Sequence, residues 1–240
     1  MKLHILRVLP IILIFPCMFS CSQKTKQKEE PKPVVSQRDS VLGDADKKRA
    51  AWAQQLHGMT VKQLTDQLSK ESVKGLEPFN SMAYKELTSR KSVTIDTIQN
   101  VVVKNANRSS LLSLLAVRKL SQPVYQKLNA QVKASVYVDA LRSAKTFNTF
   151  GLPHSKWEEA AQAIIEAGPV TTRGLEALLT DSRPAPMWGS EDYMEYKLYN
   201  YRVKDYAYAL IIGSQKGQLQ LSKDTAERDK LIDALVKGKR

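Results

Sequence analysis

From about residue 50 onward, the sequence predicts an all-α fold built from antiparallel helical pairs. Apolar side chains recur at helical spacing in one segment after another. Capping boxes and a glycine–proline pair separate these segments, as helix start and stop signals do. The segments are roughly 10–15 residues long with short turns between them, which favours antiparallel neighbours. We therefore expect one helical domain over residues 49–240.

The first half of this domain contains one clear start signal and one ambiguous helix. Thr60 and Gln63 have the spacing of a capping box. Further helices are expected over residues 78–87, 93–104 and 110–120. The middle one is ambiguous because the Val101–Val103 run would also suit a strand. The last is so rich in leucine that it should be buried on most sides.

The second half carries a boundary signal at nearly every expected turn. Pro123 suits a first helical turn, and Asn129 suits an N-cap. Residues 147–153 read as a turn with two aromatic anchors. The remaining expectations are a capping box at Ser155–Glu158, a stop at Gly168–Pro169, a helix over Thr172–Asp181 and a closing helix over 222–240.

The N-terminus has the features of an export signal. A short basic stretch precedes an apolar run over residues 8–19, which is shorter than the about 20 residues that a membrane-spanning helix needs. Ser20 and Cys21 follow, and polar residues begin at once. This resembles the lipobox of bacterial lipoproteins. The resemblance implies a signal peptide over residues 1–20 and a Cys21 that carries a diacylglycerol and a fatty acid such as palmitate. The alternative is an uncleaved or conventionally cleaved signal with Cys21 as an idle thiol.

The two cysteines limit the available chemistry. Cys17 would leave with the signal and Cys21 would be acylated, so the mature chain would hold no free thiol. This excludes thiol catalysis, a cysteine zinc site and a disulfide framework. Residues 21–48 have no apolar period, and we expect them to form a disordered tether.

The chain is strongly basic, with 37 Lys and Arg against 24 Asp and Glu and a net charge of +13. Such an excess indicates attraction to anionic surfaces, including phospholipid head groups and cell-wall polymers. The export signal and the scattered placement of the basic residues argue against a nucleic-acid partner.

One pair of helices has more specific content. Leu175–Arg183 looks like the first helix and turn of a HEAT repeat, and Tyr201–Leu210 looks like its second helix. The resemblance implies an α-solenoid and no reaction. It covers residues 172–212 best. An insertion over Pro184–Asn200 stands where that family has a tight turn.

The insertion is the leading candidate for a binding surface. Long insertions in repeat proteins often carry binding, and Tyr and Trp are enriched at interfaces. The predicted partner-binding residues are Trp188, Tyr193, Tyr196, Tyr199, Glu191 and Asp192. The competing interpretation is that these rings pack the insertion onto the end of the solenoid.

Signals for catalysis are weak. No GxSxG, HExxH, P-loop or GxGxxG motif is present. His154 with Glu158 and Glu159 could be drawn as a metal or acid–base cluster, but Glu158 already serves as the capping acid and Glu159 suits a solvated face. We therefore expect no catalytic residue, no metal and no cofactor.

The sequence thus predicts a lipid-anchored protein of the bacterial cell envelope that acts as a helical-repeat binding or scaffolding module for another protein. An outer-membrane location, facing the periplasm or the surface, is expected. Two alternatives stay open. One is an envelope hydrolase that uses carboxylates of residues 184–200 on cell-wall or polysaccharide substrate, and the other is a polyanion-binding protein.

Overall fold

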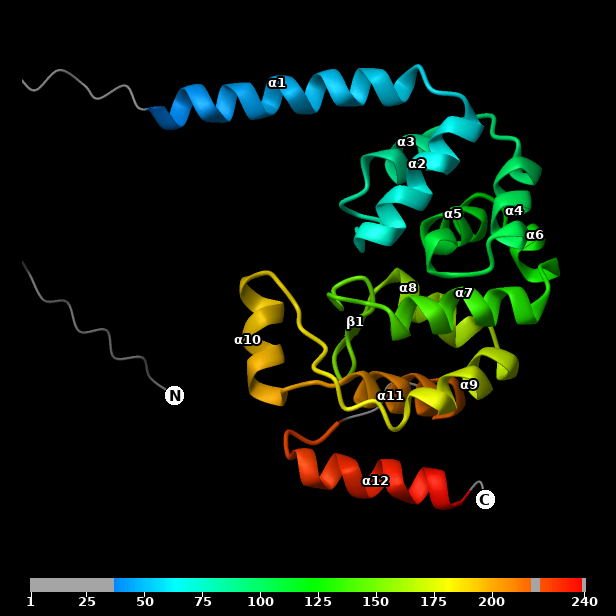
Figure 1. Cartoon of the computed structure of the whole chain (residues 1–240), viewed down its shortest axis with the longest axis vertical. Coiled ribbons are helices and arrows are strands. Elements are labelled where there is room, and N and C mark those ends of the chain that lie inside the picture. Colours follow the sequence, from blue (N-terminus) through cyan, green and yellow to red (C-terminus); the bar gives the residue numbers. More distant parts are fainter. Residues whose placement is uncertain (1–36, 217–220, 239–240) are drawn as a thin grey trace, which may run out of the picture. The chain divides into compact units, whose positions relative to one another are not determined.

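The computed structural model describes residues 37–216 and 221–238 (Figure 1). By its internal contacts the chain divides into two units, 1–43 and 44–240. Helix α1 (Gln37–His57) begins in the first unit and ends in the second. It therefore starts inside the stretch expected to be a tether, and residues 37–48 are helical. All further description concerns the second unit.

Helices make up most of the described chain, which confirms the all-α class. In chain order the helical elements after α1 are α2 (Val61–Lys74), α3 (Met82–Ser89), α4 (Ile95–Lys104), the 3-10 helix η1 (Arg108–Ser110), α5 (Leu111–Leu120), α6 (Gln122–Lys127), α7 (Ala130–Arg142), α8 (Glu159–Glu166), α9 (Pro169–Leu175), the 3-10 helix η2 (Glu176–Leu178), α10 (Ser190–Tyr199), α11 (Val203–Lys216) and α12 (Thr225–Lys237). A small antiparallel hairpin joins α7 to α8. Its strands β1 (Gly151–Leu152) and β2 (Lys156–Trp157) pair Gly151 with Trp157.

Local signals placed several helix ends correctly. The predicted box before α2 is present, because Thr60 accepts the backbone N–H of Gln63 and the Gln63 side chain reaches back to the Thr60 N–H. Asn129 accepts the N–H of Gln131 at the start of α7, as expected of an N-cap. The ambiguous valine run is helical in α4. These contacts form within one turn of chain, which is why the sequence predicts them.

Three boundaries were predicted incorrectly. The expected box at Ser155–Glu158 is replaced by β2, because the Glu158 N–H donates to the Phe150 carbonyl and closes the hairpin. The expected helix over 78–87 starts only at Met82, after Ser81 accepts the Tyr84 N–H. The helix expected over 172–181 begins directly at Pro169 and ends in η2.

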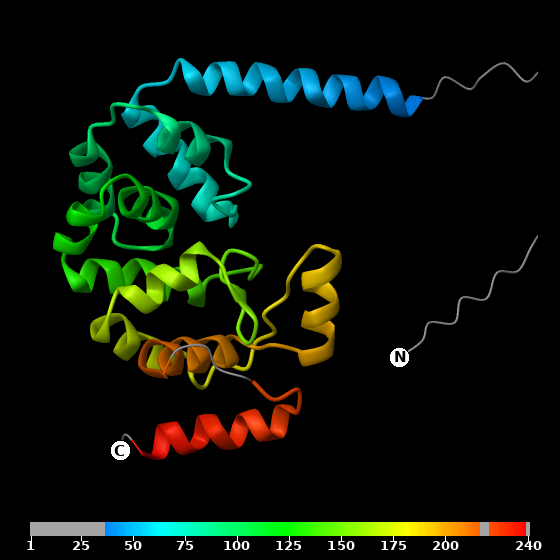
Figure 2. The same cartoon turned by 180° about the vertical axis from the view of Figure 1, so that it is seen from behind.

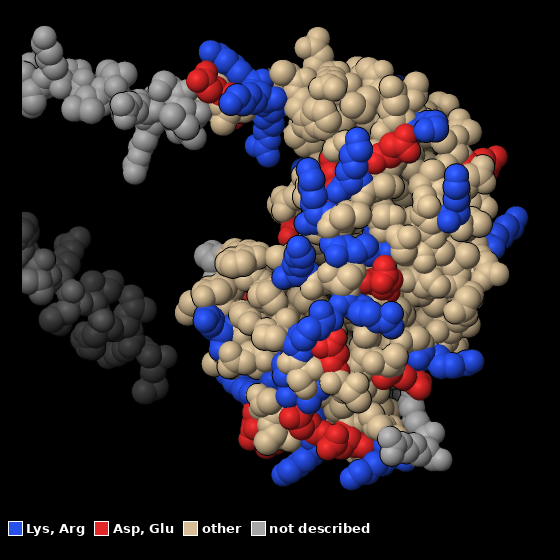
Figure 3. All heavy atoms as spheres, in the orientation of Figure 1, with Lys and Arg blue, Asp and Glu red and all other residues tan. Residues whose placement is uncertain are grey.

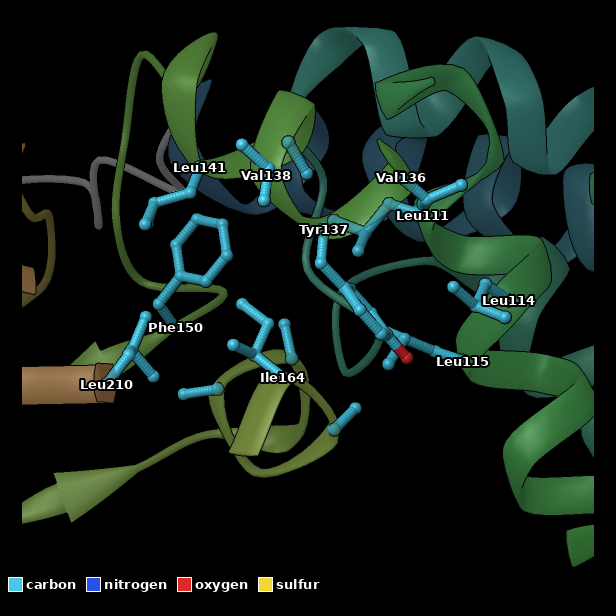
Figure 4. Packing of buried hydrophobic residues seen from close by; sticks show 14 of the residues in the cluster. Leu111, Leu114, Leu115, Val136, Tyr137, Val138, Leu141, Phe150, Ile164 and Leu210 are labelled. Atoms are coloured by element: carbon cyan, nitrogen blue, oxygen red, sulfur yellow. The ribbon is translucent and has the colours of Figure 1, made fainter. Parts of the chain in front are cut away.

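The core runs through the middle of the unit. Every residue of α5 from Leu111 to Val117 is buried, as the leucine-rich sequence predicts. Tyr137 of α7 lies beside these leucines (Figure 4), and its hydroxyl is 2.9 Å from that of Tyr125. Phe150 and Leu210 approach Ile164 from the hairpin side in the same view. Elements far apart in sequence therefore share one apolar cluster.

The C-terminal helix is attached through a buried cation. Arg228 of α12 is completely buried and its Nε donates to Asp205 of α11 at 3.1 Å. The same guanidinium donates to the carbonyls of Tyr199, Ser222 and Lys223 at 2.8, 2.7 and 3.0 Å. Helix α12 accordingly lies along α11 in both views (Figures 1 and 2).

Candidate functional site

The insertion over 184–200 forms an extended strap followed by α10. In both ribbon views α10 stands beside the β1–β2 hairpin (Figures 1 and 2). The strap is fixed by backbone contacts, with the Ala185 N–H on the Tyr201 carbonyl at 2.8 Å and the Phe147 N–H on the Pro186 carbonyl at 2.9 Å. Its position is therefore set by residues on both sides of the insertion.

The aromatic residues predicted for partner binding divide into two groups. Trp188 and Tyr193 are 63% and 37% exposed, and their rings are parallel within 3° at a centroid distance of 6.5 Å. Tyr199 is buried against His154, with ring centroids 4.4 Å apart, and Tyr196 is partly buried. One end of the insertion therefore packs against the domain and the other end faces solvent, and partner binding by the exposed rings stays a prediction.

The two predicted acidic residues also separate. Glu191 is exposed. Asp192 lines a pocket of about 410 Å³ between the turn before α3, the hairpin and α10. Three further carboxylates, Glu77, Glu158 and Glu159, line it with a single cation, Lys156.

Asn148 joins this pocket to the exposed rings. Its side-chain amide donates to the Trp188 carbonyl at 2.6 Å and to Asp192 Oδ2 at 3.3 Å, while its Oδ1 accepts the Trp188 N–H at 2.9 Å. Trp188 is thereby held at the edge of the pocket. Phe79 lines the pocket as well and is 72% exposed. The pocket is an acidic hollow with an aromatic rim.

The carboxylates of the pocket have different partners. Burial raises the pKa of Glu77, a hydrogen bond from Asn80 opposes that rise, and the charges of Glu158 and Asp192 add to it. Glu158 is paired with Lys156 at 2.6 Å. Glu159 accepts the Tyr84 hydroxyl at 2.6 Å, and burial together with this bond raises the pKa of Tyr84. The carboxyl group of Glu77 is therefore easier to protonate than that of an ordinary exposed glutamate.

Lysines of the chain already lie over two of the exposed rings. Lys85 Nζ is 5.3 Å from the Phe79 centroid, and Lys197 Nζ is 5.4 Å from that of Tyr193. Aromatic faces at this distance attract cations. The rim is thus arranged in a way that suits cationic groups.

His154 does not join Glu158 and Glu159. Its Nδ1 lies 2.8 Å from Glu195 Oε1 and 2.7 Å from the Tyr201 hydroxyl, so it links the hairpin to α10. In the described part of the chain, no group of three or more His, Cys, Asp or Glu side chains is placed to hold a metal ion. His154 therefore attaches the insertion to the hairpin.

Sequence reasoning missed Glu77, Glu158, Glu159 and Phe79 as members of the site. Glu158 and Glu159 were assigned to a helix cap and a solvated face, and nothing in the spacing of Glu77 or Phe79 connects them to residue 192. Phe79 lies in a turn and is exposed, whereas the sequence predicted a helix over residues 78–87, so it was not recognised.

Several sequence predictions concern parts that the structure leaves out. Cys21 and the segment over 1–20 lie outside the described residues. Among the described helices, none has both the length and the apolar character needed to cross a bilayer.

Comparisons of the chain with protein-family models, curated proteins and solved structures found no match in any of the three.

Proposed function

We propose that this chain is a lipid-anchored envelope protein that binds a basic segment of another protein through the acidic pocket and its aromatic rim. The helical domain would act as a HEAT-like scaffold that holds the insertion in place, and Cys21 would supply the anchor. The observation that carries the proposal is the combination of four carboxylates with the exposed rings of Phe79, Trp188 and Tyr193.

The chemistry of the pocket favours a cationic partner group. Four carboxylates face one lysine there, although the chain as a whole has a charge of +13. The Debye length is about 8 Å at physiological salt, so the local charge of the pocket dominates once a partner is in contact. Arg or Lys side chains next to apolar residues would use both the carboxylates and the rings.

The binding surface can be tested with a photo-crosslinking residue at position 193, followed by peptides copied from the crosslinked segment. Trp188→Ala with Asp192→Asn should weaken peptide binding at least about tenfold, because it removes a ring and a charge from a desolvated contact. Replacing Lys and Arg of the peptide by Gln should have a comparable effect. Fluorescence anisotropy measures both.

Met194→Ala is the matched control, since Met194 lies on α10 with Asp192, is 69% exposed and does not line the pocket. It should leave binding within about twofold. Equal losses in Met194→Ala and in the double variant would move the binding surface to the outer side of α10 and contradict the proposal.

The hydrolase alternative has one observation in its favour. Glu77, with its raised pKa, faces the carboxylate of Asp192 in the same pocket, and a glycosidase needs one protonated and one ionised carboxyl group. Turnover of cell-wall oligosaccharide by the wild type, abolished in Glu77→Gln, would support this alternative. Peptide binding by the wild type without any turnover of the oligosaccharide would support the binding module.

The anchor has its own test. Cys21→Ser removes the sulfur that would carry the diacylglycerol, so the variant should incorporate no labelled palmitate and should leave the membrane fraction. Acyl chains contribute about 0.8 kcal/mol per buried methylene, which makes the expected shift in partition large. Incorporation of label into Cys21→Ser, or unchanged sedimentation with membranes, would show that the anchor assignment is wrong.

A further inference from the structure

A second hollow, of opposite character, lies along α7 and α9. It is an open groove of about 600 Å³, and its polar lining includes Asn107, Gln131, Ser135, Asp139, Arg142 and Arg173. Its remaining walls are small or apolar residues. The acidic pocket described above shares none of these residues.

The two arginines of the groove have unused guanidinium groups. Among the described residues, neither Arg142 nor Arg173 makes a side-chain hydrogen bond or an ion pair, and both are exposed. Every other arginine described after α1 does use its guanidinium. These are Arg90, Arg108, Arg118, Arg183, Arg202 and Arg228. Of the arginines described after α1, the two with uncommitted guanidinium groups therefore line the same groove.

Close helix packing brings these two arginines together. A Cβ at Gly174 would lie 2.8 Å from Val138 Cγ2, so α9 touches α7 at this point. Arg173 is the chain neighbour of Gly174, and Arg142 follows Val138 by about one turn, or roughly 6 Å of helix. Both side chains start within one turn of the same contact and line the same hollow.

We propose that this groove binds a phosphate group. A guanidinium group offers a rigid fork of N–H donors that matches phosphate oxygens, and two such forks need more acceptor oxygens than one carboxylate has. Amide groups of Gln131 and Asn107 and the hydroxyl of Ser135 supply further donors in the lining. The groove is lined by other residues than the proposed peptide pocket. On the face of the molecule shown in Figure 3, basic and acidic side chains are interspersed.

Asp139 is the one carboxylate in the lining. It accepts the backbone N–H of Arg108 at 2.9 Å, so an asparagine could keep that bond through its amide oxygen. The negative charge of Asp139 opposes an anion in the groove. Asp139→Asn should therefore bind phosphate more tightly than the wild type does.

The test uses the full chain with Cys21→Ser, so that no acyl group contributes to membrane binding. One arm titrates glycerol 3-phosphate by calorimetry, and the other measures co-sedimentation with phosphatidylglycerol vesicles. Arg142→Gln with Arg173→Gln should lower the affinity at least about tenfold in the arm that contains the true ligand, because charged hydrogen bonds are lost. The control, Lys91→Gln with Lys127→Gln, removes the same charge from exposed positions outside the groove lining.

The outcomes of the two arms distinguish the source of the phosphate group and test whether the groove binds it. Loss in the first arm identifies a free phosphate compound as the ligand class, and loss in the vesicle arm alone identifies a lipid head group. Equal loss in the arginine and lysine variants would mean unspecific attraction by the +13 chain and would overturn the proposal. So would absence of wild-type binding in both arms, or weaker binding by Asp139→Asn. Thermal unfolding of each variant checks that the fold is retained.

Discussion

Replacing Asp205 by asparagine is expected to lower the free energy of unfolding by about 3–5 kcal/mol, because it leaves a buried cation without its counter-charge. Arg228 and Asp205 are both fully buried and Nε to Oδ1 is 3.1 Å. An arginine cannot shed its proton inside a protein, so the charge of Arg228 persists in the variant. Urea unfolding monitored by circular dichroism measures the loss.

The matched control is Glu166→Gln, which also converts a carboxylate to an amide. Glu166 pairs with Arg118 at 2.6 Å but is 43% exposed. Exposed pairs contribute about 0–1 kcal/mol, so this variant should unfold almost like the wild type. Similar losses in the two variants would mean that burial of the Asp205 pair does not govern the docking of α12.

Gly151→Ala is expected to destabilise the domain by about 3 kcal/mol or more, because the hairpin leaves no room for a side chain. The backbone has φ +80° there, and a Cβ would lie 2.2 Å from the Lys156 carbonyl oxygen and 2.6 Å from the Glu158 nitrogen. Both are backbone atoms, so relief requires the strands to separate. The Gly151 carbonyl, which accepts the Tyr206 hydroxyl at 2.8 Å, would move with them.

Gly189→Ala is the matched control, because it separates the effect of backbone strain from the effect of a steric clash. Gly189 also has positive φ, at +102°, but nothing lies within 4 Å of an added Cβ. We expect a loss of only about 1–3 kcal/mol, the cost of placing a side chain on this positive-φ extended backbone. Melting temperatures that fall equally in the two variants would refute the clash at Gly151.

Only part of the candidate site could be predicted from the sequence. Composition singled out the insertion, and Trp188 and Asp192 do lie at the pocket. Tyr199 is identical in kind to Tyr193, yet it is buried against His154 because the hairpin folds over that end of α10. No spacing within residues 184–200 distinguishes the two tyrosines. The distinction depends on a hairpin whose sequence suggested a helix cap.

The sequence alone determined the helical class, the buried α5 and the caps of α2 and α7, because these features depend on contacts within one or two turns of chain. Only the tertiary structure decided that Glu77 would face Asp192 and that Arg142 and Arg173 would share a groove. Those pairs are separated by 115 and 31 positions, and they meet because apolar faces and a glycine contact fix how the helices pack. Packing of that kind is set by the summed burial of many side chains, and no local pattern encodes it.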